Sequence, residues 1–276
     1  MDAECGAGNR CGFDGYCYAM WGCLAVDRER AAAPASLRYT TQVRNIEAID
    51  DPSRVGDLMV QACSVLDPNC AVPNVGPLDA TVSTDKVLTA TFQSVPSTGF
   101  IGALQVDDLT AAAGILPSYV HFTADTPLYG DFRAQTPLLL IRAELFKLLA
   151  GAAAVQIDPN ATTIAVRVHD CGGRAAPGVS MAAPGSPAAL FVPLQADRVP
   201  VVNGTETTED GGALLVNVPA NRPVPLTLSD FATGRILSDS ALLNPRPSAI
   251  NYLFWYPRQS AQQKWMTEAR KRGLTP

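Results

Sequence analysis

The sequence has little charge and almost no histidine. Charged residues make up 17% of its 276 residues, only two residues are histidine, and Lys plus Arg (21) are outnumbered by Asp plus Glu (26). A nucleic-acid-binding domain needs a concentrated basic face that neutralises phosphates. This charge balance therefore argues against nucleic acid as a partner, and the composition alone does not identify a function.

Long apolar runs are also missing. The longest candidate, Leu138 to Ile141, is far shorter than the roughly 20 residues that a membrane-spanning helix needs. We therefore expect no transmembrane segment. The first residues, Met1 to Glu4, contain neither a basic nor an apolar segment, so no signal peptide is visible. If the cysteines form disulfides, we expect that an export signal has been removed.

The seven cysteines are unevenly placed, and six of them fall into two groups. These six are candidates for disulfide bonds: Cys5, Cys11, Cys17, Cys23, Cys63 and Cys70. The first four allow two bonds in any of three pairings, and a bond between Cys63 and Cys70 would close a short loop. Gaps of five residues separate the first four, whereas paired zinc ligands usually lie two residues apart, so disulfides are favoured over zinc. Cys171 is either an unpaired thiol or the partner of a cysteine in the first half.

Glycine and proline are abundant and indicate short strands and turns. They number 21 and 22. We expect a mainly β protein with two tandem antiparallel β-sandwiches, a small disulfide-rich N-terminal cap and one or two short helices. The expected parts are a Cys-rich cap and linker (1–36), a first sandwich ending in a short helix (37–157), a second sandwich (158–258) and a C-terminal helix (259–276).

Alternation of apolar and polar residues predicts eight strands. They are expected at residues 58–62, 87–92, 100–106, 119–122, 164–168, 214–218, 226–228 and 250–255. A helix is predicted where Leu145, Leu148 and Leu149 form an apolar stripe, with Gly151 as the C-terminal cap. A capping box at 260–263 predicts the second helix. For this terminal helix we favour docking against the protein over a role as a partner-binding handle.

Two stretches of the chain resemble each other. They are VSTDKVLTATFQSVPS (82–97) and ETTEDGGALLVNVPAN (206–221). Each runs from an acidic turn that contains threonine, through an alternating strand, to a Val-Pro pair. Acidic and glycine residues favour the turn, and the proline ends the pairing of the strand. Because each stretch follows a strand that ends near a cysteine, we interpret the two halves as an internal repeat.

The second half resembles the carboxypeptidase regulatory-like domain, a seven-stranded prealbumin-type β-sandwich. The residues that match the motifs of this family are Asp170, Gly173, Ala176-Pro177-Gly178-Val179, Thr208, Asp210, Gly211 and Val218-Pro219. The sequence departs from the family at Glu209, which is inserted in the turn, and at Asn221, which stands near an expected glycine. Residues 58–106 match more loosely, with Lys86 in place of the turn glycine.

This resemblance covers residues 55–257 and implies a sandwich fold for each half. The whole layout also resembles exported proteins of myxobacterial type, which join a Cys-rich start to two such sandwiches. The motifs are structural, and the regulatory domain has no catalytic residue to carry over. The resemblance therefore implies a fold and a compartment, and it implies no reaction.

Neither histidine is expected to serve a catalytic or metal site. In His169-Asp170-Cys171, neighbouring side chains on a strand point to opposite faces, so all three cannot easily meet one ion. We interpret this stretch as the end of a strand that runs into an Asx turn. His121 has apolar neighbours and is interpreted as a buried imidazole. We expect no catalytic residue, no metal and no cofactor.

The aromatic residues near the C-terminus form one candidate ligand surface. Tyr252, Trp255 and Tyr256 could stack on sugar rings through apolar contacts. The alternation along this strand requires one of its two faces to belong to a core. We therefore favour a packing role for these residues and keep sugar contact as the alternative.

Together these features predict a non-catalytic exported protein, a structural or adhesive module of the cell envelope or surface. Its expected location is extracellular, periplasmic or at the outer membrane. Its expected partner is a protein or another envelope component, and the sequence leaves a homo-oligomer open. The alternatives are a carbohydrate-binding module and, with less support, a hydrolase or a metal-dependent enzyme.

Overall fold

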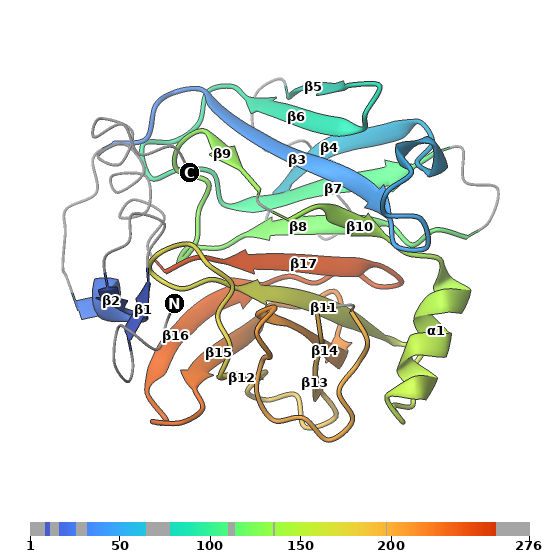
Figure 1. Ribbon diagram of the computed structural model, residues 1–276. Helices are drawn as coiled ribbons and strands as arrows, with labels where there is room; N and C mark the ends of the chain where they lie inside the picture. The colour runs from blue at the N-terminus through green and yellow to red at the C-terminus, as the bar shows by residue number, and fades with distance from the viewer. Residues whose placement is uncertain are drawn as a thin grey trace.

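In the computed structural model the chain is mainly β-structure, arranged in layers around one long sheet (Figure 1). The structure describes residues 9–11, 17–25, 32–64, 78–109, 114–134, 136–196 and 198–257. The predicted C-terminal helix, Cys5 and Cys70 lie outside these ranges. Within them, no helix is long and apolar enough to cross a membrane.

Each of the eight predicted strands is present, with ends that differ by a few residues. The described strands are β1 (Asn9–Cys11), β2 (Cys17–Ala19), β3 (Leu37–Asn45), β4 (Leu58–Ser64), β5 (Asp79–Val82), β6 (Val87–Phe92), β7 (Gly102–Asp108), β8 (Ser118–Phe122), β9 (Phe132–Arg133), β10 (Leu138–Leu140), β11 (Ala161–Val168), β12 (Val179–Ala182), β13 (Leu190–Pro193), β14 (Gly212–Pro219), β15 (Val224–Asp230), β16 (Ile236–Leu243) and β17 (Ile250–Trp255). The described helices are η2 (Gly22–Ala25), η3 (Pro52–Arg54) and α1 (Ala143–Ala152).

A seven-stranded sheet, here called the shared sheet, runs through the whole molecule in the order β13-β14-β11-β17-β8-β7-β4. Its strands come from both halves of the chain, because β17 pairs in parallel with β11 on one side and with β8 on the other. The predicted boundary at residue 158 therefore does not separate two sheets. The halves share one sheet, and their sandwiches are not independent tandem units.

Two smaller sheets pack against this shared sheet. The five-stranded sheet has the order β10-β3-β6-β5, with β9 also paired to β3, and the three-stranded sheet has the order β12-β15-β16. Both β10 and β9 run parallel to β3. The expectation of purely antiparallel sandwiches is therefore wrong at these two pairs and at the two pairs made by β17.

The two smaller sheets cover opposite faces of the shared sheet. On β17, Leu253 and Trp255 belong to the core under the three-stranded sheet, whereas Tyr252 and Phe254 pack against the core under the five-stranded sheet. Val120 lies directly opposite Tyr252 and belongs to the second of these cores. Because side chains alternate between faces along a strand, each core occupies one face and one end of the shared sheet.

The helix α1 ends later than the sequence predicts. Gly151 lies inside α1, and Ala154 instead adopts the left-handed conformation (φ 56°) that closes the helix. The backbone N–H groups of Ala154 and Val155 bond back to Gly151 and Ala150, which is the pattern of a Schellman cap. Leu148, predicted to belong to the buried stripe, is 69% exposed. The predicted position of the C-terminal cap, Gly151, is therefore three residues before the observed one, Ala154.

A disulfide attaches the N-terminal segment to the second half of the chain. It joins Cys23 to Cys171, so the predicted pairing within the first cysteine group is wrong for Cys23. Trp21 packs against Trp255, with ring centroids 6.1 Å apart, and its indole N–H donates to Asp230 Oδ2 (2.9 Å). The segment is therefore held by a covalent bond and by a buried aromatic contact.

Candidate functional site

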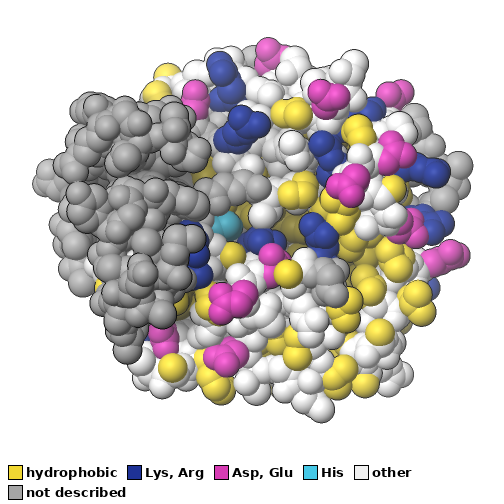
Figure 2. Space-filling model, in the orientation of Figure 1, with side chains coloured by type: hydrophobic (Ala, Val, Ile, Leu, Met, Phe, Trp, Pro, Cys, Tyr) yellow, Lys and Arg dark blue, Asp and Glu magenta, His cyan; other side chains and the backbone are white. Residues whose placement is uncertain are grey.

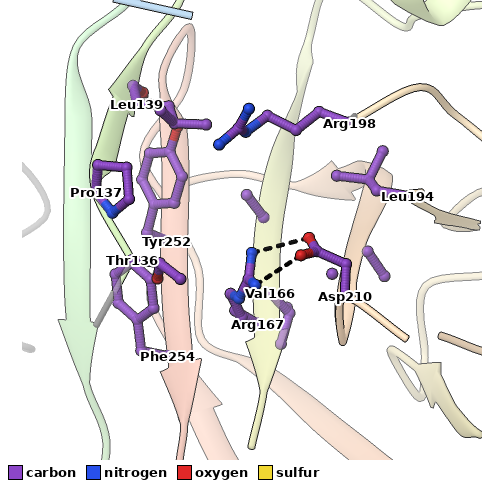
Figure 3. Close-up of a pocket in the computed structure, with 13 residues that line it drawn as sticks. Thr136, Pro137, Leu139, Val166, Arg167, Leu194, Arg198, Asp210, Tyr252 and Phe254 are labelled. Atoms are coloured by element: carbon purple, nitrogen blue, oxygen red, sulfur yellow. Dashed lines mark hydrogen bonds and ion pairs between the residues drawn. The ribbon is translucent and has the colours of Figure 1, made fainter. Parts of the chain in front are cut away.

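A cleft opens on the face of the shared sheet that carries Tyr252 and Phe254. It lies over β17, β11 and the start of β14, beside the edge of the five-stranded sheet, and has a volume of about 80 Å³ (Figure 3). The residues that line it are Thr136, Pro137, Leu139, Ala165, Val166, Arg167, Leu194, Arg198, Asp210, Gly212, Ala213, Tyr252 and Phe254. Figure 2 shows a hollow on this side of the molecule, with basic and apolar side chains around it.

The floor of the cleft is set by the pairing of β11 with β17. Ala165 lies opposite Tyr252, and Arg167 lies opposite Phe254. The rings of Tyr252 and Phe254 are nearly parallel, at 9° with centroids 6.2 Å apart. Because alternate residues on each strand share a face, the strands place two aromatic rings beside a small residue and a guanidinium.

An ion pair forms one side of this floor. The Nη1 and Nη2 atoms of Arg167 donate to the two carboxylate oxygens of Asp210, at 2.9 and 2.7 Å (Figure 3). Gly211 next to this carboxylate has φ 64°, and a Cβ there would lie 2.5 Å from the carbonyl oxygen of Val168. The turn glycine that the sequence singled out thus lets the chain bring Asp210 over Arg167.

The walls of the cleft come from two other segments. On one side Tyr252 Oη donates a hydrogen bond to the carbonyl oxygen of Leu139, which joins the floor to β10. On the other side Arg198 reaches across the cleft toward Tyr252 (Figure 3). Burial raises the pKa of the Tyr252 phenol, and the cation of Arg198 opposes this rise.

A buried histidine lies two residues beyond Arg167 in the chain, outside the lining of the cleft. His169 stacks on Tyr256, with ring centroids 4.0 Å apart, and its Nδ1–H donates to the carbonyl oxygen of Gly173 (3.1 Å). Burial lowers the pKa of His169 to about 3, so its imidazole is neutral at physiological pH. Asp170 instead accepts hydrogen bonds from the N–H groups of the following turn, and Cys171 is in the disulfide. These three residues therefore form the predicted turn.

His121 is also a core residue. It is 6% exposed, and its ring Nε2–H donates to Asn251 Oδ1 (3.0 Å). Burial lowers the pKa of His121 to about 4. The interpretation of this residue as a buried imidazole with a partner is confirmed. Within the described ranges, no three His, Cys, Asp or Glu side chains are grouped closely enough to hold a metal ion.

Of the three aromatic residues predicted to form a ligand surface, only Tyr252 lines the cleft. Trp255 and Tyr256 are 2% and 1% exposed, so neither can offer its ring to a ligand. Tyr252 does line the cleft. The sequence analysis missed Arg167, Asp210 and Arg198 as site residues, because no local pattern shows that a turn, a strand and a loop meet here.

A second cavity lies under α1. It has a volume of about 330 Å³ and is bounded by Phe146 and Lys147 of α1, by Thr162 and Thr163 of β11, and by the loop at Ser248. No ion pair forms among the described residues that bound it, and Thr162 Oγ1 donates to the carbonyl oxygen of Arg246. The cleft over β11 and β17 is therefore the stronger candidate.

Comparison with known proteins does not assign a family. No family model matches this chain, and no curated protein matches it. One solved structure that matches is the endo-fucoidan hydrolase MfFcnA4 of glycoside hydrolase family 107, with 11% identity and a TM-score of 0.18 over 82% of this chain. The chain spans 27% of the length of that enzyme.

Another solved structure is the N-terminal Ig1-2 module of the Drosophila receptor protein tyrosine phosphatase DLAR. It has 7% identity and a TM-score of 0.16, over 82% of this chain and 97% of that one. TM-scores this low support no argument about fold or function, so the function is argued from the residues.

Proposed function

We propose that this protein is a non-catalytic interaction module that acts outside the cytoplasm, at the cell envelope or surface, and contacts its partner through the cleft. The partner is a protein or another envelope component. The disulfide between Cys23 and Cys171 supports the compartment, because such bonds persist in oxidising surroundings. Cys63 is also disulfide-bonded.

The observation that carries the proposal is the state of the ionisable groups around the cleft. Asp210 accepts two hydrogen bonds from Arg167, so its carboxylate is engaged in a structural pair. His169, two residues beyond Arg167, is buried with its pKa lowered to about 3, so it is not protonated at neutral pH. An apolar floor with paired charges and fixed geometry suits binding better than proton transfer.

Carbohydrate binding is the second candidate function. It is supported by the parallel rings of Tyr252 and Phe254, which together offer an apolar contact surface inside the cleft. The burial of Trp255 and Tyr256 removes them from this role. A carbohydrate ligand would thus meet two rings on β17 and the polar groups on either side of them.

The proposal is tested by adding fractions of the producing organism's envelope, separated into protein and polysaccharide, to oxidised ¹⁵N-labelled protein. One fraction should shift the amide signals of Gly212 and Ala213, and leave those of β5 in place. The substitution Leu194→Glu in the cleft wall should abolish the shifts, whereas Val82→Glu, at an exposed site on β5, should not.

Two outcomes would refute the proposal. In the first, neither fraction shifts the cleft signals. In the second, the protein hydrolyses a chromogenic ester or glycoside and loses this activity on Asp210→Asn, which would make the ion pair part of a catalytic site.

A further inference from the structure

Among the residues that the structure describes, nothing neutralises one cation of the cleft. Arg167 and Asp210 cancel each other's charge. The side chain of Arg198, at the other wall, has no hydrogen bond and no ion pair with any part of the chain that the structure describes, although its backbone N–H donates to the carbonyl oxygen of Gln195 (2.8 Å). Its guanidinium extends across the mouth of the cleft (Figure 3). The cleft therefore carries a net positive charge over an aromatic floor.

Two further donors in the cleft also lack a partner. The Nη1 and Nη2 atoms of Arg167 donate to Asp210, but its buried Nε–H makes no hydrogen bond. The Oγ1 atom of Thr136, on the same side of the cleft as Leu139, is likewise buried without a hydrogen bond. Buried polar groups in folded proteins are normally satisfied, so these two donors are free to pair with a ligand; since each has almost no exposed surface, its side chain must turn toward the cleft to do so.

The aromatic floor restricts the shape of that ligand. Tyr252 and Phe254 present two nearly parallel rings, which pack well against the C–H face of a saturated ring. The volume of about 80 Å³ is large enough for one end of such a ring but not for a long apolar chain. The ligand must combine an apolar face, several acceptor oxygens and one negative charge.

We propose that the cleft binds an acidic sugar residue, a pyranose that bears a carboxylate, as a unit of an envelope polysaccharide. The carboxylate pairs with the guanidinium of Arg198, whose planar shape suits two parallel hydrogen bonds. Arg167 Nε–H and Thr136 Oγ1–H donate to ring hydroxyls, and the C–H face lies on Tyr252 and Phe254. This inference rests on the proposed function, since it names the partner that the cleft contacts.

The test compares digalacturonic acid with its methyl ester, which keeps the rings and removes the charge. Binding is followed by the amide shifts of Gly212 and Ala213 in the oxidised full-length protein. The acid should bind about tenfold more tightly than the ester, because hydrogen bonds to charged groups are the stronger ones. Its affinity should fall as the salt concentration rises.

Variants then identify the groups responsible. Arg198→Gln should remove the preference for the acid, and Thr136→Val should weaken both ligands severalfold. The matched controls are Arg222→Gln and Thr81→Val, which change exposed residues on a distant turn and on β5. The Arg198 side chain makes no bond to the described residues, so Arg198→Gln should keep the thermal midpoint of the parent protein, and this value shows that the variant is folded.

The possible results separate the inference from the proposed function. Equal binding of acid and ester, or an acid preference that survives Arg198→Gln, refutes the acidic sugar. Tighter binding of a glutamate-rich peptide at the same amides would also refute it, in favour of a protein partner. If neither sugar shifts the cleft signals while an envelope fraction still does, only the sugar assignment fails. If nothing shifts them, the proposed function fails as well.

Discussion

The two faces of the shared sheet carry polar side chains that are organised differently. On one face, Gln61 Nε2 donates to Gln105 Oε1 (2.7 Å), and Gln105 Nε2 donates to Asp107 Oδ2 (2.6 Å); we refer to these three residues as the glutamine row. On the other face, the cleft leaves Arg198 without a partner among the described residues. The glutamine row satisfies much of its own hydrogen bonding, whereas the Arg198 side chain in the cleft bonds to no described residue.

One sheet therefore has both a closed polar surface and an open cleft. Each small sheet covers one face of the shared sheet at one end. The opposite face at that end is covered by no sheet, so its own side chains must satisfy their polar groups and cover its apolar groups. At β4 and β7 this is done by amides that bond across the ladder. At β11 and β17 it is done by aromatic rings and an ion pair, which leave a cleft.

The largest expected effect comes from pH, because each face lies near one buried histidine. Burial lowers the pKa of His121 to about 4 and of His169 to about 3, while an unfolded histidine titrates near 6.5. The unfolded chain therefore binds more protons below pH 6.5, so stability falls as the pH drops. Each histidine should lower the free energy of unfolding by about 3 kcal/mol between pH 7 and pH 4, or about 6 kcal/mol for both, as measured by urea unfolding.

Single substitutions separate the two histidines. His169→Phe should reduce the dependence of unfolding free energy on pH by about half, with the other half left to His121. His121→Phe is made in parallel. In both variants a phenyl ring takes the buried place of the imidazole ring, so that the titrating group is removed and an aromatic ring is kept. An unchanged pH dependence in both variants would contradict the assignment.

The next largest effect is expected at the turn that positions Asp210. Gly211→Ala introduces a side chain at φ 64°, and its Cβ would lie 2.5 Å from Val168 O and 2.8 Å from Ala176 N. We expect a loss of about 4 kcal/mol in unfolding free energy. The control is Lys86→Gly at the turn between β5 and β6, where φ is 55°.

At that control turn the expected change is below about 1 kcal/mol. Removing the side chain relieves the left-handed backbone, but it also removes the hydrogen bond from Lys86 Nζ to the carbonyl oxygen of Gly56 (2.8 Å). Equal destabilisation by the two substitutions would show that contact with Val168 and Ala176 does not distinguish the turns.

Removal of the disulfide by the double substitution Cys23→Ser and Cys171→Ser should lower the free energy of unfolding by about 3 kcal/mol. The bond closes a separation of 148 residues and holds Trp21 in the core under the three-stranded sheet. Hydrogen exchange should therefore speed up in β12, β15 and β16 more than in β3 and β6. Uniform acceleration in both cores would contradict this local role.

The smallest expected effect lies in the glutamine row. Gln105→Leu removes two side-chain hydrogen bonds and should cost about 1 kcal/mol, compared with Gln42→Leu at an exposed position on β3. Burial raises the pKa of Asp107, and the bond from Gln105 opposes this rise. The substitution should therefore raise the pKa of Asp107 further, which a carboxylate NMR titration would measure; a lower pKa would be the contrary result.

Much of the local structure follows from the sequence. Alternation correctly predicted β6 and β11, because a half-buried strand needs one apolar face. The turn glycine at residue 211, the buried state of His121 and the turn after His169 also followed from neighbouring residues. By contrast β3 was missed, since its buried apolar residues Leu37, Tyr39 and Val43 are interrupted by Thr41.

The site could not be predicted in the same way. Arg167 was predicted only as a strand residue, and no prediction was made for Arg198, although both line one cleft. Their approach depends on the pairing of β14 with β11 and of β13 with β14. No residue near either arginine in the chain carries this information.

The sequence by itself determined which segments form strands, where the chain turns and which side of each strand is apolar, because these depend on neighbours a few residues away. Only the tertiary structure decided that β17 lies between β8 and β11, that Cys23 bonds to Cys171 and that Tyr252 meets Arg198. Many apolar faces and strand edges in this chain are locally alike, so neighbouring residues do not determine which of them pair. Their outcome depends on which long-range arrangement buries all of those faces at once.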